Sequence, residues 1–260
     1  MVKPKHHLGQ NFLVNVGLID HVLSKIDLKP HDHVVEIGPG LGVLTQAMAP
    51  LVARLDCIEL DNDLKHKLAF LKSMEHVNIH WQDALDQPLS SWFLNRPFRV
   101  ISNLPYQITS PILFECLAAI DSLQDVVLLL QYEVVKRLSA SPHTKAYGQL
   151  TVLIQAAFEV ECLLKVSPGS FRPPPKVDSA FVWLKPKKKR NYPAKELHFI
   201  VKKAFLHRRK MLRSSLKSFQ HLPLPLQWDD RPEDISVAQW IDVASVLAAL
   251  IQKGEVPPID

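Results

Sequence analysis

The sequence predicts an α/β fold: a mostly parallel sheet with helices on both faces, followed by a small all-helical C-terminal domain. Up to about residue 130, short apolar and β-branched runs alternate with segments of helical spacing, which is typical of a parallel sheet. After residue 190 the apolar residues follow helical spacing alone. With 260 residues, 47% of them hydrophobic, the chain is long enough to bury a substantial core.

Seven strands are expected, at residues 33–37, 55–60, 77–81, 100–101, 126–130, 161–166 and 179–184. Residues 41–51 and 64–71 have the spacing of helices that cover the sheet. The basic run at residues 185–190 marks a change of composition. It predicts a domain boundary that divides the chain into residues 1–189 and 190–260.

The C-terminal domain is expected to contain a helix with one basic face. Apolar residues from Leu197 to Leu216 keep helical spacing. On one continuous helix, at about 100° per residue, six basic side chains fall within an arc of roughly 120° on the opposite side: Lys202, Lys203, Arg209, Lys210, Arg213 and Lys217. Arg208 falls on the apolar side. Ser236 followed by Gln239 forms a capping box, which predicts a last helix through Leu250.

Charge is distributed unevenly along the chain. Residues 185–217 contain thirteen Lys or Arg and one acid, a local net charge of +12, while the whole chain carries +5 and the remainder therefore −7. A cationic block on an otherwise acidic protein indicates an anionic partner. A solvated charge run or a flexible linker remains the alternative on this observation alone.

Several classes of protein are excluded by composition. Three widely spaced cysteines without a CxxC pair argue against a disulfide framework and structural zinc, and they fit a reducing cytoplasm. The histidines have no metal-ligand spacing. Apolar runs such as that at residues 126–130 are too short to span a bilayer, and the N-terminus lacks a secretory apolar stretch. We therefore expect a cytoplasmic protein with no metal and no membrane association.

Three glycines follow the first predicted strand. Gly38, Gly40 and Gly42 form a strand–glycine–helix turn that lets a ligand approach the backbone. The dinucleotide fingerprint fails, because its third glycine position is occupied by Val43 or Thr45, depending on the register. Glu36 also places a carboxylate where a pyrophosphate would be repelled, whereas a zwitterionic amino-acid ligand would tolerate it.

Acids follow the next two strands. Glu59 lies 19 residues after Gly40, a suitable distance for hydrogen bonds to ribose hydroxyls, and Asp83 is placed to accept from the exocyclic amine of an adenine. Each acid alone is more often a surface or capping residue. Together with the glycine turn they trace a site along the carboxyl edge of the sheet, which favours S-adenosylmethionine over NAD as the ligand.

The tetrapeptide at residues 103–106 follows the fourth strand and indicates the acceptor. The carboxamide oxygen of Asn103 and the carbonyl oxygen of Leu104 can accept from an exocyclic adenine amine, which would free its delocalised lone pair for attack. Pro105 fixes φ, and Tyr106 offers a face for stacking. Phe171, in the proline-rich loop, is expected to close the other side of the base. The alternatives are an Asn-x-Pro turn with a partly buried tyrosine, and a polyproline ligand or spacer at residues 173–175.

Eight motifs, in this order, resemble those of the ribosomal RNA adenine dimethyltransferases that act on the small subunit. They are residues 8–13 (LGQNFL), 36–42 (EIGPGLG), 58–61 (IELD), 83–85 (DAL), 103–106 (NLPY), 147–150 (YGQL), 174–179 (PPKVDS) and 208–213 (RRKMLR). The resemblance covers nearly the whole chain. The glycine motif alone is shared by many methyltransferases, whereas the full ordered set is highly specific.

The resemblance implies a Rossmann-like class I methyltransferase. It implies transfer of two methyl groups from S-adenosylmethionine to N6 of each of two neighbouring adenines in the 3′-terminal hairpin loop of small-subunit rRNA. By motif matching, the cofactor contacts would be Asn11, Leu13, Gly38, Gly40, Glu59, Asp83 and Asn103, with Gln10 nearby. The target adenine would be held by Asn103, Leu104, Tyr106 and Phe171, and the basic residues at the RNA would be Arg208, Arg209, Lys210 and Arg213. One departure is Gln82, where such enzymes commonly have glycine.

The family further implies a pre-30S particle as the preferred substrate, and we expect a monomer. Two alternatives remain open. One is a large-subunit rRNA adenine N6-methyltransferase of the erythromycin-resistance type, which shares the fold and chemistry. The other is a non-catalytic nucleic-acid-binding factor that keeps the fold as a scaffold.

Overall fold

The computed structural model describes residue 5, residues 10–92 and residues 97–259, so Leu8 and Gly9 of the N-terminal motif lie outside the described residues. The described chain divides into two compact units. The first takes the chain up to Val135 and again Glu159–Pro186, and the second takes Lys136–Phe158 and the chain from Lys187 onward.

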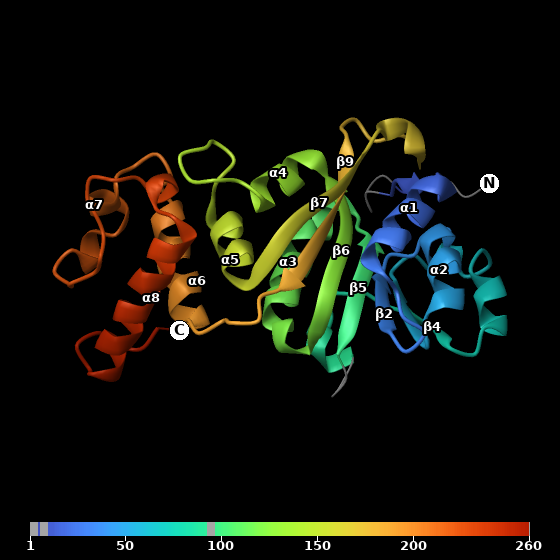
Figure 1. The fold of residues 1–260 in the computed structure, drawn as a ribbon, viewed down its shortest axis with the longest axis horizontal. Helices are drawn as coiled ribbons and strands as arrows, with labels where there is room; N and C mark the ends of the chain where they lie inside the picture. Colours follow the sequence, from blue (N-terminus) through green and yellow to red (C-terminus); the bar gives the residue numbers. More distant parts are fainter. Residues whose placement is uncertain (1–4, 6–9, 93–96, 260) are drawn as a thin grey trace. The chain divides into compact units, whose positions relative to one another are not determined.

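A seven-stranded sheet organises the first unit (Figure 1). Its strands run in the order β4-β3-β2-β5-β6-β9-β7. Their bounds are β2 (His33–Ile37), β3 (Arg54–Glu59), β4 (Val77–Trp81), β5 (Phe98–Asn103), β6 (Leu123–Gln131), β7 (Phe158–Val166) and β9 (Ser179–Pro186). The neighbouring strands β4, β3, β2, β5 and β6 pair in parallel, and β9 pairs with β6 in antiparallel orientation. The predicted α/β fold and its seven strands are confirmed.

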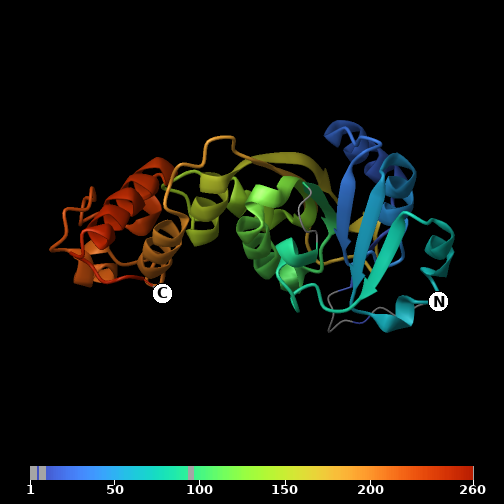
Figure 2. The same cartoon turned by 90° about the horizontal axis from the view of Figure 1, so that it is seen from below.

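Helices cover the sheet on both faces. On one face α1 (Val16–Ile26) and α2 (Val43–Met48) share a core with β2 and β3, and on the other α3 (Thr109–Ala118) packs against β6 (Figure 2). A short sheet joins β1 (Phe12–Leu13) to β8 (Phe171–Arg172). The helix α4 (Tyr132–Leu138) follows β6 directly. These contacts hold the carboxyl ends of the strands as a fixed edge.

Two of the predicted helices differ from the structure. Residues 64–71 form no α-helix but parts of two 3-10 helices, Asn62–Leu64 and Ala69–Ser73. Leu64, Leu68 and Leu71 are nonetheless buried, because successive tight turns direct these side chains into the core as a helix would. The helix predicted at 41–51 begins only after Gly42, whose φ is +76°, and it tightens into a 3-10 helix at Ala49–Leu51.

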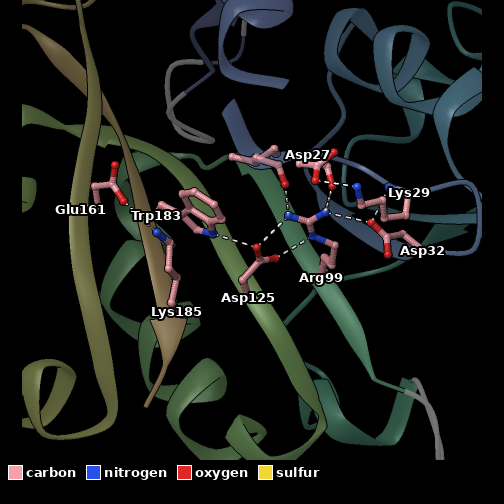
Figure 3. Close-up of polar contacts among 9 residues, drawn as sticks. Asp27, Lys29, Asp32, Arg99, Asp125, Glu161, Trp183 and Lys185 are labelled. Carbon is pink, nitrogen blue, oxygen red and sulfur yellow. Dashed lines mark hydrogen bonds and ion pairs between the residues drawn. The ribbon is translucent and has the colours of Figure 1, made fainter. Parts of the chain in front are cut away.

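A buried ionic network ties β5 to its neighbours in the first unit (Figure 3). Arg99 on β5 binds Asp125 on β6 through Nε and Nη2, both at 2.7 Å, and Asp32 through Nη1 at 2.8 Å. Trp183 on β9 donates from its indole to Asp125 at 2.7 Å. The network therefore links β5, β6 and β9 at the strand that ends in Asn103.

The second unit is helical. It contains α5 (Gln149–Ala157), α6 (Ala194–Phe205), α7 (Leu212–Ser215) and α8 (Val237–Gln252). Ser236 accepts from the Gln239 N–H at the start of α8, so the predicted capping box and last helix are confirmed. Residues 136–158, which the predicted division assigns to residues 1–189, pack here: the buried Tyr147 hydroxyl donates to the Ile235 carbonyl at 2.8 Å.

The prediction of one long basic helix between Leu197 and Leu216 is wrong. The helix α6 ends at Phe205, and a turn separates it from α7. The reason is tertiary: the N–H groups of Leu212 and Arg213 donate to the carbonyls of Asp230 and Trp228, both at 2.8 Å, which holds this stretch against another segment. The six basic residues therefore do not share one helical face.

Candidate functional site

A single pocket collects most of the predicted site residues at the carboxyl ends of β2, β3 and β5. Every expected cofactor contact lines it: Gln10, Asn11, Leu13, Gly38, Gly40, Glu59, Asp83 and Asn103. Leu104 and Tyr106, the expected acceptor residues, line it as well. Residues as far apart in sequence as Gln10 and Tyr106 are thus brought to one cavity.

The glycine turn shapes the floor of this pocket. Gly38, Gly40 and Gly42 all have positive φ, which side-chain-bearing residues rarely adopt. A Cβ on Gly40 would lie 2.9 Å from Cδ1 of Phe12, closer than packed atoms come. Its N–H donates to Oε2 of Glu59 at 3.1 Å. The turn therefore needs glycine here for conformation and for space.

Glu59 lies at the tip of β3 and is buried. Its Oε1 accepts from the Asp61 N–H at 2.8 Å, and its Oε2 from Gly40. Burial raises the pKa of this carboxyl, while the two backbone donors oppose that effect. Each oxygen retains a lone pair, so the side chain is suited to accept from the hydroxyl groups of a ribose.

The environment of Glu36 differs from the expectation that its carboxylate repels a pyrophosphate. Its side chain is 1% exposed, and Thr45 donates to its Oε2 at 2.6 Å. Burial raises its pKa to about 8, so the group is largely protonated at neutral pH. Repulsion of a pyrophosphate by this group is therefore weak. Val43 and Thr45, which stand where a dinucleotide site would need its third glycine, are what disfavour a dinucleotide.

Asp83 follows β4 and has a local structural role as well as a place in the pocket. Its Oδ1 accepts from the Leu85 N–H at 2.9 Å, which holds the turn after the strand. Gln82, the departure from the family pattern, lines the same pocket. The side chain of Asp83 is half-exposed, so its second oxygen is available to a ligand.

Asn103 is oriented by the N-terminal segment. Its Nδ2 donates to the carbonyl oxygen of Asn11 at 3.1 Å, which fixes the sense of the carboxamide. Because the amide nitrogen is engaged, Oδ1 is the atom left to accept from a ligand. The buried Ser102 Oγ accepts from the Ile37 N–H at 2.7 Å and so ties the tips of β5 and β2 together.

Sequence reasoning missed the contacts that secure the N-terminal segment. Lys5 donates from Nζ to Oδ1 of Asp61, and Gln10 donates to its Oδ2 at 2.8 Å. The Lys5 Nζ also pairs with Asp63 at 2.6 Å. No spacing signal connects residues some 55 positions apart. The IELD motif held the only hint, since its last residue is an acid that follows the strand.

Other lining residues were also unassigned, among them Pro39, Leu60, Ala84, Gln107 and Ile108. Pro39, Leu60 and Ala84 lie inside the quoted motifs, and Gln107 and Ile108 come just after one, so closeness to a motif was the available signal. The structure does not bring Phe171 to this pocket. It lies in β8, has no exposed surface and belongs to the hydrophobic core, so it cannot stack on a base without rearrangement of β1 and β8.

The predicted RNA-binding residues lie in the second unit and differ in exposure and in ion pairing. Arg208 is half-buried, and its Nε donates to Glu233 at 2.6 Å. Arg209 and Lys210 are exposed in the turn after α6, and Arg213 is exposed but pairs with Asp229 at 2.7 Å.

Among the described residues, no three His, Cys, Asp or Glu side chains are grouped to hold a metal ion. In the described part of the chain no helix is long and apolar enough to cross a bilayer.

Comparison with known proteins identifies the family. The model of the family described as ribosomal RNA adenine dimethylase matches residues 1–248. Ribosomal RNA small subunit methyltransferase A of Marinobacter nauticus is 41% identical over 253 residues, which cover 94% of this chain and 91% of that protein. The protein of the same name from Hydrogenovibrio crunogenus is 44% identical over 231 residues, with 84% and 86% covered.

Solved structures agree on the fold. A dimethyladenosine transferase from Plasmodium falciparum superposes with a TM-score of 0.78 at 23% identity, covering 94% of this chain and 98% of that one. The 23S rRNA methyltransferase ErmE superposes with a TM-score of 0.69 at 25% identity, covering 92% and 100%. By its match to the family model along nearly its whole length, this chain belongs to the ribosomal RNA adenine dimethylase family.

Proposed function

We propose that this enzyme uses S-adenosylmethionine to dimethylate N6 of two neighbouring adenines in the 3′-terminal hairpin loop of small-subunit rRNA, within a pre-30S particle. The observation that carries the proposal is the orientation of Asn103, whose Nδ2 is held by Asn11 so that Oδ1 is left for a substrate amine. The relatives at 41% and 44% identity are named for the small subunit, which supports that choice of rRNA.

The residues of the pocket fit the proposed cofactor. Glu59 would accept from the ribose hydroxyls, Asp83 from the adenine amine, and the glycine turn leaves room for the ligand beside its backbone. When bound, S-adenosylmethionine supplies an electrophilic methyl group on a sulfonium. The largely protonated Glu36 adds no strong charge beside it.

The tetrapeptide would activate the acceptor without a strong base. An adenine amine is a weak nucleophile because its lone pair is delocalised into the ring. By accepting from its two N–H bonds, Asn103 Oδ1 and the Leu104 carbonyl would draw the nitrogen towards tetrahedral geometry. Tyr106 would hold the extruded base by stacking, worth about 1–3 kcal/mol. Positioning and preorganised dipoles thus supply the catalysis.

We assign cofactor binding and catalysis to the first unit, and RNA recognition to the second. Arg209, Lys210 and Arg213 are its exposed candidates, and exposed cations are what phosphate contacts require. Arg208 would first have to leave Glu233. We further propose that the enzyme acts as a cytoplasmic monomer.

Mass spectrometry of rRNA nucleosides tests the proposal. Small-subunit rRNA from cells lacking this protein should lack the two dimethyladenosines, and purified enzyme with S-adenosylmethionine should restore them on particles from those cells. Asn103→Ala should abolish transfer while RNA binding persists. Modification of large-subunit rRNA alone would favour the erythromycin-resistance type of enzyme. RNA binding without any methyl transfer would favour a non-catalytic factor.

A further inference from the structure

The Tyr106 hydroxyl has a partner outside the acceptor tetrapeptide. It lies 2.8 Å from Oγ of Ser179, a residue 73 positions further along the chain. We propose that Ser179 is a positioning residue, which fixes the ring of Tyr106 and thereby sets how completely the enzyme adds the second methyl group to each adenine. The inference rests on the proposed function.

Ser179 is a fixed point in the sheet. It is the first residue of β9, it has no exposed surface, and it lies opposite Gln131 in the antiparallel pair with β6. The adjacent Asp178 carbonyl accepts from the Tyr132 N–H at 2.9 Å, so the backbone beside Ser179 is held as well. A hydroxyl on such a backbone can hold a neighbouring side chain in place.

Tyr106 is the side chain that needs such an anchor. It opens a 3-10 helix of only three residues, directly after Pro105, and such a short turn provides few hydrogen bonds of its own. The ring is half-buried at the pocket. Burial also raises the pKa of its hydroxyl, so the group keeps its proton at neutral pH and can share it with Ser179.

The two methyl transfers make different demands on this ring. An unmodified adenine amine has two N–H bonds, one for Asn103 Oδ1 and one for the Leu104 carbonyl. In the first transfer the N–CH3 bond forms as the S–CH3 bond breaks, S-adenosylhomocysteine leaves, and the nitrogen loses one proton to solvent. It then has one N–H bond, so only one of these acceptors can be engaged. The stacked ring of Tyr106 must then supply a larger share of the positioning. A loosened ring should therefore impair the second transfer more than the first.

Two matched variants test this. Ser179→Ala removes only the anchor, and Tyr106→Phe keeps the stacking face but removes the hydroxyl. Each should slow the second transfer by about two- to tenfold, the range expected for one neutral hydrogen bond. In single-turnover assays on unmethylated small-subunit particles, N6-monomethyladenosine should therefore accumulate. The double variant should be no worse than either single variant, because both remove the same interaction.

A control variant and a test of folding separate the possible outcomes. Ser24→Ala, at an exposed position of α1, is the serine control and should leave the product ratio unchanged. Calorimetry with S-adenosylmethionine reports folding, and if Ser179→Ala fails to fold, Tyr106→Phe alone decides. An unchanged product ratio in folded Ser179→Ala, or additive effects in the double variant, would overturn the inference. Absence of dimethyladenosine with the wild-type enzyme would instead refute the proposed function.

Discussion

Replacing Arg99 with methionine should unfold the first unit far more readily than its single lost charge suggests. The guanidinium is 2% exposed and makes four contacts of 2.7–2.8 Å, three to the carboxylates of Asp32 and Asp125 and one to the Ile26 carbonyl (Figure 3). Methionine fills similar space but leaves two buried acids without their cation. Breaking a buried pair in this way costs about 3–5 kcal/mol.

Urea and thermal unfolding, followed by circular dichroism, measure that loss. At about 2–4 °C per kcal/mol for a chain of this size, the melting temperature should fall by roughly 6–20 °C. Lys185→Met, on β9 near the network, is the control, because its ion pair with Glu161, at 2.8 Å, is exposed and worth at most about 1 kcal/mol. If Arg99→Met lost no more stability than Lys185→Met, the buried network would not hold the sheet together.

Three more changes follow from the site and the basic turn. Gly40→Ala should weaken S-adenosylmethionine binding at least tenfold in calorimetry, since its Cβ meets Phe12 at 2.9 Å and its φ is +60°; wild-type affinity would refute the steric argument. Burial raises the pKa of Glu36 from an ordinary 4.5 to about 8 in the folded state. Between these two pH values the folded state holds a proton that the unfolded state has lost. The free energy of unfolding should therefore fall as pH rises from about 4.5 to 8, by up to about 1.4 kcal/mol per pH unit. Glu36→Gln should flatten that decline in melting temperature, and an unchanged slope would place the titrating group elsewhere. Arg209→Ala with Lys210→Ala should weaken RNA binding and reduce its salt dependence in filter-binding assays, whereas an unaltered slope would place the RNA surface elsewhere.

Periodicity predicted the centre of the sheet well because β2, β3, β5 and β6 are buried along most of their length. The strand at residues 126–130 consists of apolar residues alone, and all five are fully buried in β6. The pocket followed from the same logic, since parallel strands bring their carboxyl tips to one edge. Glu59 and Asn103 could thus be placed together from sequence.

Where prediction failed, distant contacts decided the structure. The stretch from Leu197 to Leu216 keeps helical spacing, yet backbone bonds from Leu212 and Arg213 to the 228–230 segment interrupt the helix. Phe171 was expected to face a base, but pairing of β8 with β1 buries it. Neither pairing leaves a mark in the local sequence pattern.

The division of the chain has a consequence for biosynthesis. The two units alternate along the polypeptide, with each taking two separate stretches. The parallel strands β2 to β6 are all synthesised before residue 136, but β9, which covers the free edge of β6, ends only at Pro186. During translation the apolar edge of β6 therefore stays unpaired until some fifty more residues have been synthesised. Nascent chains that stop in this interval should be the ones most prone to aggregate.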